Sequence, residues 1–193
     1  MAEIKKGKRM KRLIQKKIKK TKENLYYILS ALMIGLIVGG IDALFGRVLI
    51  AITDFRGRYI QILIWFLPIA GLFICWMYHR FNEMSLKGMT LVLETAQGKR
   101  ADIPLALVPL VMVGTWITHL FGGSAGREGV AVQIGATLSH WFARRFKFAD
   151  NRTILLIAGM AAGFGGLFQT PFAAVFFAME VVVTGKMLYQ AFL

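Results

Sequence analysis

Apolar residues along the chain form runs of two very different lengths. Residues 24–53 form one long apolar segment, interrupted only by Asp42 and Arg47. A helix of this length extends roughly 43 Å, whereas the hydrocarbon core of a bilayer is about 30 Å thick. The pattern therefore predicts a tilted helix, or one with an interfacial end. A polar turn over residues 54–58 and a second span over 59–79 are expected to follow.

The later apolar segments are mostly too short to cross a bilayer. Residues 103–121 are long enough for a full span, but four other segments are shorter: 88–97, 130–142, 153–168 and 172–184. Short apolar segments separated by Gly and Pro indicate half-spanning or re-entrant helices. Such helices are typical of channels and transporters, because the free N–H groups at their starts form ion sites.

Composition agrees with a membrane protein. Of the 193 residues, 56% are apolar and 18% are charged, whereas soluble domains have about 25% charged residues. These values exclude a disordered tail, a secreted disulfide-framed module, a coiled coil and most soluble enzymes. Cys75 is the single cysteine, and the three histidines lie far apart. We therefore expect no metal, no cofactor and no enzymatic activity.

The positive charge is concentrated at the start of the chain. Residues 1–24 hold eleven Lys and Arg against two Glu, which accounts for +9 of the net charge of +14. Binding to nucleic acid or anionic lipid is one interpretation; the apolar span that follows favours an arm that orients the protein with its N-terminus in the cytoplasm. The sequence thus predicts a basic cytoplasmic arm, 1–23, a membrane domain, 24–193, and no nucleic-acid partner. Two further basic stretches, 80–100 and 144–152, would lie on the same side.

The most informative motif is the glycine-rich string at residues 122–135. Its glycines let successive backbone N–H groups point toward one place, and a helix starting near Glu128 adds its positive end, which together make an anion site. Ionised, Glu128 can occupy that site; protonated, it can leave and admit a free anion. The alternative is that these glycines pack helices together and Glu128 pairs with Arg127. The Gly35/Gly39 and Gly159/Gly163 pairs are interpreted as packing contacts only.

Two strings in register resemble the CLC family of anion channels and proton-coupled anion antiporters. GSAGREGVAVQIGA at 123–136 is similar to the family's GREGP signature and the helix after it, and residues 158–180 are similar to its Gly/Ala-rich helix and the next helix. The resemblance implies an all-α membrane fold of inverted repeats with tilted, half-spanning and re-entrant helices. It also implies that Glu128 is the gating glutamate, with Gly126, Arg127, Gly129 and Val130 at the anion site.

Departures from the family pattern point to one clade. Chloride-transporting members carry GSGIP before the short helix, where this chain has Gly88, Met89 and Thr90. Many exchangers also have a second glutamate after the helix that here ends at Glu180, and this chain has Val181 at that position. These changes resemble the bacterial fluoride/proton antiporters. Met89 would then line the anion site in place of the serine, although it could simply fill a gap, and a shift of one residue would make Thr90 the ligand. The resemblance assigns structural roles to four further residues: Glu94, Phe168, Pro171 and Glu180.

The resemblance implies fluoride export in exchange for protons across a bacterial plasma membrane. The alternative within the family is a chloride channel or chloride/proton exchanger. The alternative outside the family is a lipid- or RNA-binding membrane protein that acts through its basic arm. The chain would be the first of two repeats, a fragment ending near the last helix of that repeat (186–193), and homodimeric at full length. The expected partners are fluoride or chloride, protons and the lipid bilayer.

Overall fold

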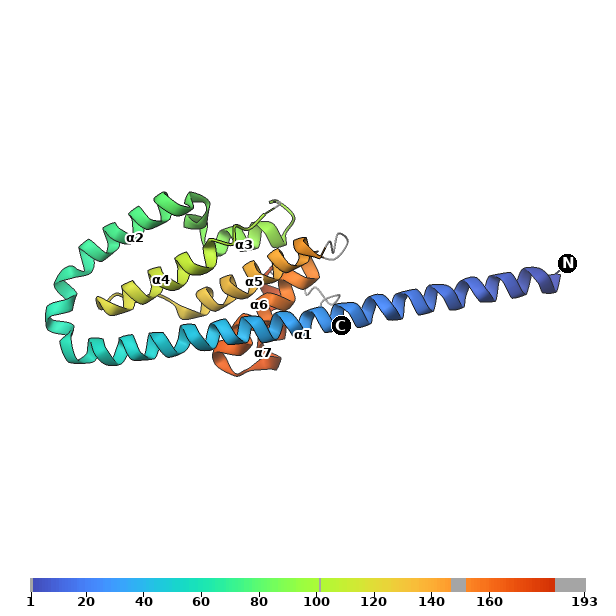
Figure 1. Cartoon of the computed structure of the whole chain (residues 1–193), viewed down its shortest axis with the longest axis horizontal. Coiled ribbons are helices and arrows are strands. Elements are labelled where there is room, and N and C mark those ends of the chain that lie inside the picture. Colours follow the sequence, from blue (N-terminus) through green and yellow to red (C-terminus); the bar gives the residue numbers. More distant parts are fainter. Residues whose placement is uncertain (1, 101, 147–151, 183–193) are drawn as a thin grey trace.

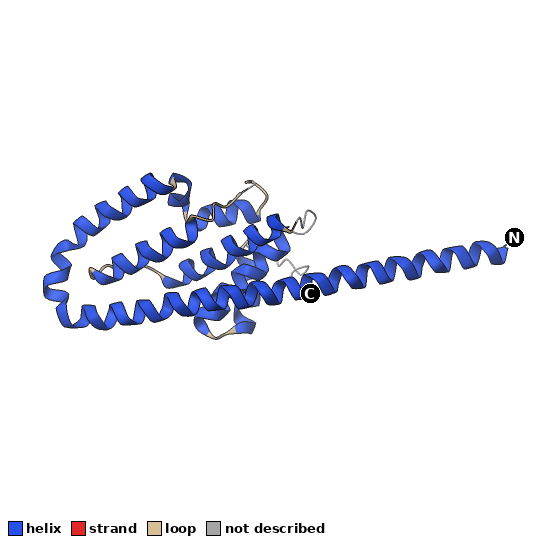
Figure 2. Ribbon diagram, in the orientation of Figure 1, coloured by secondary structure: helices blue, strands red, loops and turns tan. Residues whose placement is uncertain are grey.

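The protein is built from helices. Its structure, a computed structural model, describes residues 2–100, 102–146 and 152–182. Within these ranges there are helices and loops but no strand (Figure 2), so the prediction of an all-α chain is confirmed. In chain order the elements are α1 (Ala2–Leu63), the 3-10 helix η1 (Ile64–Phe66), α2 (Leu67–Phe81), the 3-10 helix η2 (Glu83–Lys87), α3 (Met89–Ala96), α4 (Leu107–Leu120), α5 (Arg127–Arg145), α6 (Arg152–Phe168) and α7 (Pro171–Val181). The end segment 186–193 lies outside the described residues.

Helix α1 is much longer than the sequence predicted. It has 62 residues, about 93 Å of helix, and its N-terminal part projects beyond the other helices (Figure 1). The predicted turn at 54–58 is wrong, because the helix continues through this segment until Tyr59, whose φ of −125° and ψ of 15° are not helical. The segment contains no proline, and Phe55 packs on Tyr59 one turn later, with ring centroids 5.0 Å apart. Polar residues alone do not end a helix when its backbone N–H groups can still donate hydrogen bonds to carbonyl groups of the preceding turn.

Two other helices differ in length from the predictions. Helix α4 has 14 residues, fewer than the expected span over 103–121, because the chain around Pro104 forms a turn first. Helix α5 has 19 residues rather than about 13, since it begins at Arg127 and continues to Arg145. Among the described residues, one helical run, Leu25–Phe81, is long and apolar enough to cross a membrane; α4, α6 and α7 are shorter apolar helices.

Helix α5 lies in the middle of the core. Val132 and Ala136 belong to a cluster with buried residues of α3, α4, α6 and α7. On another face, Val130 and Ile134 pack with residues of α1 and α4, including Phe45 and Val111. Because apolar neighbours enclose α5 on several sides, its position is set by packing against all of them.

The contact between α5 and α6 is a contact between backbones. A methyl group added at Gly135 would overlap the carbonyl of Gly159, and one at Gly163 would overlap the carbonyl of Ala131. The prediction that Gly159 and Gly163 serve packing is confirmed, since only glycine permits so close an approach. The same interpretation of Gly35 and Gly39 is confirmed only in part: the backbone of Gly39 lies beside Gly166 of α6, but a methyl group at Gly35 or Gly39 meets no atom within 4 Å.

We predict that Gly163→Ala destabilises the protein. The added methyl group would push against the Ala131 carbonyl, and overpacking of this kind costs about 1–3 kcal/mol. Thermal unfolding of the natural full-length protein in detergent, followed by tryptophan fluorescence, measures the change. Gly71→Ala in α2 is the matched control, because a methyl group there meets nothing within 4 Å and alanine favours a helix by about 0.5–1 kcal/mol. Equal stability of the two variants would contradict the close contact.

Candidate functional site

Helices α3 and α5 begin beside each other, 38 residues apart in sequence. The side-chain amide of Gln133 lies between their starts. A methyl group added at Gly88, before α3, would stand 3.6 Å from Oε1 of Gln133, and one at Gly129, in the first turn of α5, would stand 3.8 Å from Nε2. Gly88 has φ of 51° and ψ of −122°, a conformation that residues with side chains rarely adopt. This turn lets α3 start against α5.

Both helix starts present backbone N–H groups that no side chain caps. Neither Gly88 before α3 nor Gly126 before α5 provides a capping side chain. The first N–H groups of a helix have no partner within it, and they carry its positive end. The two starts together can therefore attract an anion without a cationic side chain.

Glu128 is the acidic residue of the first turn of α5. Its Oε2 would stand 3.0 Å from a methyl group added at Gly126, so the carboxyl group folds back toward the start of its own helix. In this chain the side chain is exposed. A carboxyl group in this place can compete with an external anion for the same N–H groups.

Arg127 makes its contacts on another side of the α5 start. Its guanidinium carbon lies 5.9 Å from the ring centroid of Phe168, at the end of α6, within the range of a cation–π contact. It also lines a cavity of about 310 Å³ with Asp54, Arg56 and His119. Arg127 thus contacts α6 and borders a cavity that residues of α1 and α4 also line.

The remaining residues expected near the anion site are distributed differently. The side chain of Val130 is buried in the apolar core with Phe45 and Val111. Met89 is half-buried and packs against the cluster that includes Leu91, whereas Thr90 is exposed. At the start of α3, the backbone of Gly88 lies beside the Gln133 amide, and Met89 packs against the cluster that contains Val132 and Ala136 of α5.

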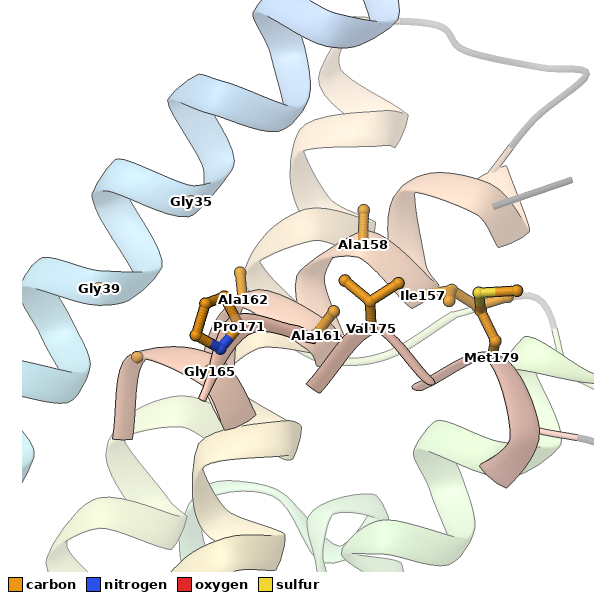
Figure 3. A pocket seen from close by; sticks show the side chains of 11 residues that line it. Gly35, Gly39, Ile157, Ala158, Ala161, Ala162, Gly165, Pro171, Val175 and Met179 are labelled. Carbon is orange, nitrogen blue, oxygen red and sulfur yellow. The ribbon is translucent and has the colours of Figure 1, made fainter. Parts of the chain in front are cut away.

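The predicted structural residues lie in two other places. Glu94, on α3, forms an ion pair with Arg100 and lies 3.8 Å from Nζ of Lys87. Pro171 begins α7 and lines a cavity of about 420 Å³, where it faces Gly39 of α1 and Gly165 of α6 (Figure 3). Glu180, near the end of α7, is exposed.

Sequence reasoning missed a cluster at the far end of α5. Nε2 of His140 lies 3.3 Å from Oδ1 of Asp102, and Arg144 forms an ion pair with the other carboxylate oxygen. Partial burial raises the pKa of Asp102, but the hydrogen bond and charge of Arg144 and the nearby His140 outweigh this, and the pKa lies below its usual value. Because 38 residues separate Asp102 from His140, no local pattern could have indicated the pair.

Asp42 was visible in the sequence only as an interruption of an apolar segment. It is 2% exposed, and neither carboxyl oxygen has a hydrogen-bond partner among the described residues. The described residues contain no group of three or more His, Cys, Asp and Glu side chains that could hold a metal.

Comparison with known proteins identifies a family and several relatives. The family model described as "Voltage gated chloride channel" matches residues 70–193. A "Chloride/fluoride channel protein" of Pseudomonas syringae pv. tomato is 36% identical over 82% of this chain and 35% of the relative. An "H(+)/Cl(-) exchange transporter ClcA" of Citrobacter koseri is 27% identical over 87% of this chain and 38% of the relative.

A solved structure is also similar. The crystal structure of a CLC-type fluoride/proton antiporter has 48% sequence identity and a TM-score of 0.82, and the match covers 84% of this chain and 41% of that chain. The chain thus spans between about a third and two fifths of the length of these relatives.

We predict that Glu94→Gln lowers the free energy of unfolding. The change removes the charge that holds Arg100 and Lys87, and a carboxylate that pairs with two cations contributes more to stability than a single exposed ion pair. Chemical unfolding of the natural full-length protein is the measurement. Glu83→Gln is the control, because the side chain of Glu83 is 76% exposed and pairs with His79 across one turn. A loss no larger than that of the control would exclude a structural role for Glu94.

Proposed function

The chain belongs to the CLC family of voltage gated chloride channels, and on this premise we propose that it serves to export fluoride across a membrane in exchange for protons. One observation carries the proposal: α3 and α5 begin on either side of the Gln133 amide, and the carboxyl group of Glu128 folds back over the start of α5. The similarity to a fluoride/proton antiporter at 48% identity supports it.

The exchange follows from competition for one set of N–H groups. When Glu128 is ionised, its carboxylate is attracted to the positive end of α5 and excludes other anions. When Glu128 takes up a proton, that attraction is lost and the side chain leaves, so an anion can bind. Binding of an anion and binding of a proton are thus coupled through one side chain.

The choice of fluoride rests on what the site lacks. At the start of α3 this chain has Met89 in place of the serine of chloride-transporting members, and a thioether is bulky and a weak hydrogen-bonding group. A site formed by backbone N–H groups and bounded by methionine favours a small anion that accepts strong hydrogen bonds. Chloride transport is the second candidate, because one relative is named an H(+)/Cl(-) exchange transporter.

The proposal includes an arrangement in the membrane. Residues 1–23 form a cytoplasmic arm and residues 24–193 the first of two repeats, in a homodimer in the bacterial plasma membrane. The excess of basic residues before the first apolar segment supports this orientation, because cytoplasmic segments of membrane proteins are enriched in Lys and Arg.

We predict that proteoliposomes holding the natural full-length protein release fluoride much faster than chloride, while protons move in the opposite direction. A backbone site of limited size binds fluoride and not the larger chloride. Ion-selective electrodes and a pH-sensitive dye measure the three fluxes. Equal release of fluoride and chloride would favour the chloride candidate, and fluoride release without proton movement would indicate a channel.

We predict that Glu128→Gln abolishes proton movement, because an amide cannot carry the proton that couples the two ions. The same proteoliposome assay measures it. Glu83→Gln is the control, since the side chain of this glutamate is 76% exposed and pairs with His79. Proton movement at the unaltered rate in Glu128→Gln would remove Glu128 from this role.

A further inference from the structure

Three buried polar atoms of α5 have no hydrogen-bond partner among the described residues. They are Oε1 of Gln133, Oγ1 of Thr137 and Nδ1 of His140. Within the described residues, the two carboxyl oxygens of Asp42 are the other buried side-chain atoms in this condition. Buried polar atoms without partners are rare, and they usually contact an ordered water molecule.

The three side chains lie on one face of α5. Their spacing of four and then three residues places them one above another along the helix, over about 10 Å. The atoms are already covered within this chain, so a group from outside the chain cannot reach them while the helices keep their packing. Water is the partner that fits along such a row.

The row joins the two sites described above. At one end, the Gln133 amide lies between Gly88 and Gly129, at the starts of α3 and α5. At the other, His140 has a side chain only 3% exposed, and its Nε2 lies 3.3 Å from Oδ1 of Asp102, whose side chain is 49% exposed. A proton at the start of α5 could thus reach the surface near Asp102 along a single helix face.

We propose that Gln133, Thr137 and His140 line a hydrated path that carries protons between the start of α5 and Asp102. The inference rests on the proposed function, because it supplies a route for the protons exchanged there. On this path Gln133 is a positioning residue, since an amide can orient water but does not relay a proton at neutral pH.

The transfer at His140 balances in one step. A hydronium ion on the path gives one proton to Nδ1 and is left as water, while the Nε2–H proton passes to the carboxylate of Asp102. One N–H bond forms and another breaks, and the neutral carboxyl group then releases its proton to water outside. A flip of the ring about its Cβ–Cγ bond then exchanges the two nitrogens and restores the starting arrangement, so each cycle moves one proton from the path to Asp102.

The charges around His140 suit this role. Asp102, from the loop before α4, stabilises a protonated ring, whereas Arg144 on α5 and Arg152 on α6 oppose it. His140 also lines a cavity of about 160 Å³ with Thr95, Arg100 and Arg152. With the Asp102 carboxylate beside Nε2, and with Nδ1 on its other side unpaired among the described residues, the ring can accept a proton at one nitrogen and release one at the other, as a relay requires.

The experiment compares proton and fluoride fluxes in proteoliposomes of the natural full-length protein and its variants. Thr137→Val and His140→Gln are expected to reduce proton flux roughly tenfold or more, with fluoride binding retained. Ser139→Ala is the matched control, because this buried hydroxyl group on another face of α5 already donates to the carbonyl of Ala136 at 3.0 Å; it should leave proton flux unchanged.

The outcomes separate this inference from the proposed function. Unaltered proton flux in both Thr137→Val and His140→Gln would overturn the path alone, whereas fluoride release without protons in the unmodified protein would overturn the proposed function as well. Should the variants not fold, NMR of the unmodified protein with labelled Thr and His gives a second test. Magnetisation transfer from water to Thr137 and His140 supports the path, and its absence overturns it.

Discussion

The backbone contact between α5 and α6 determines where the other parts of the site can lie. Gly135 of α5 and Gly159 and Gly163 of α6 bring the two helices so close that a methyl group at any of the three would overlap neighbouring atoms. This contact fixes one side of α5, and clusters with α1 and α4 hold another. On the remaining surface, Gln133 lies beside the start of α3 and His140 lies beside Asp102 in the loop before α4.

The fixed position of α5 explains how the short helix α3 is held in place. Helix α3 has eight residues, too few to be stable alone, so its direction depends on packing against α5 and α6. The turn at Gly88 directs the start of α3 to the start of α5, and Gln133 contacts both. The uncapped starts of two helices thus lie near one side chain, and the proposed anion site depends on both.

Local patterns predicted the helices better than their ends. The glycine-rich string before Glu128 correctly indicated a helix start, because an extended Gly126 precedes α5 directly. The turn expected at 54–58 does not form, since the polar residues there can point outward while the backbone bonds of α1 continue. The pair Gly35 and Gly39 has the same spacing as Gly159 and Gly163 but lines a cavity, where an added methyl group would meet no atom within 4 Å. Spacing alone does not reveal which glycines meet a neighbour.

The sequence by itself determined that the chain is helical, that it suits a membrane, and that Glu128 stands at the start of a helix, because hydrophobicity, glycine content and helix starts are local properties. Only the tertiary structure decided which groups meet: Gly88 with Gln133, Arg127 with Phe168, and Asp102 with His140. These pairs lie between 38 and 45 residues apart. Each depends on how whole helices pack, and that packing results from the combined contacts of residues that no single segment contains.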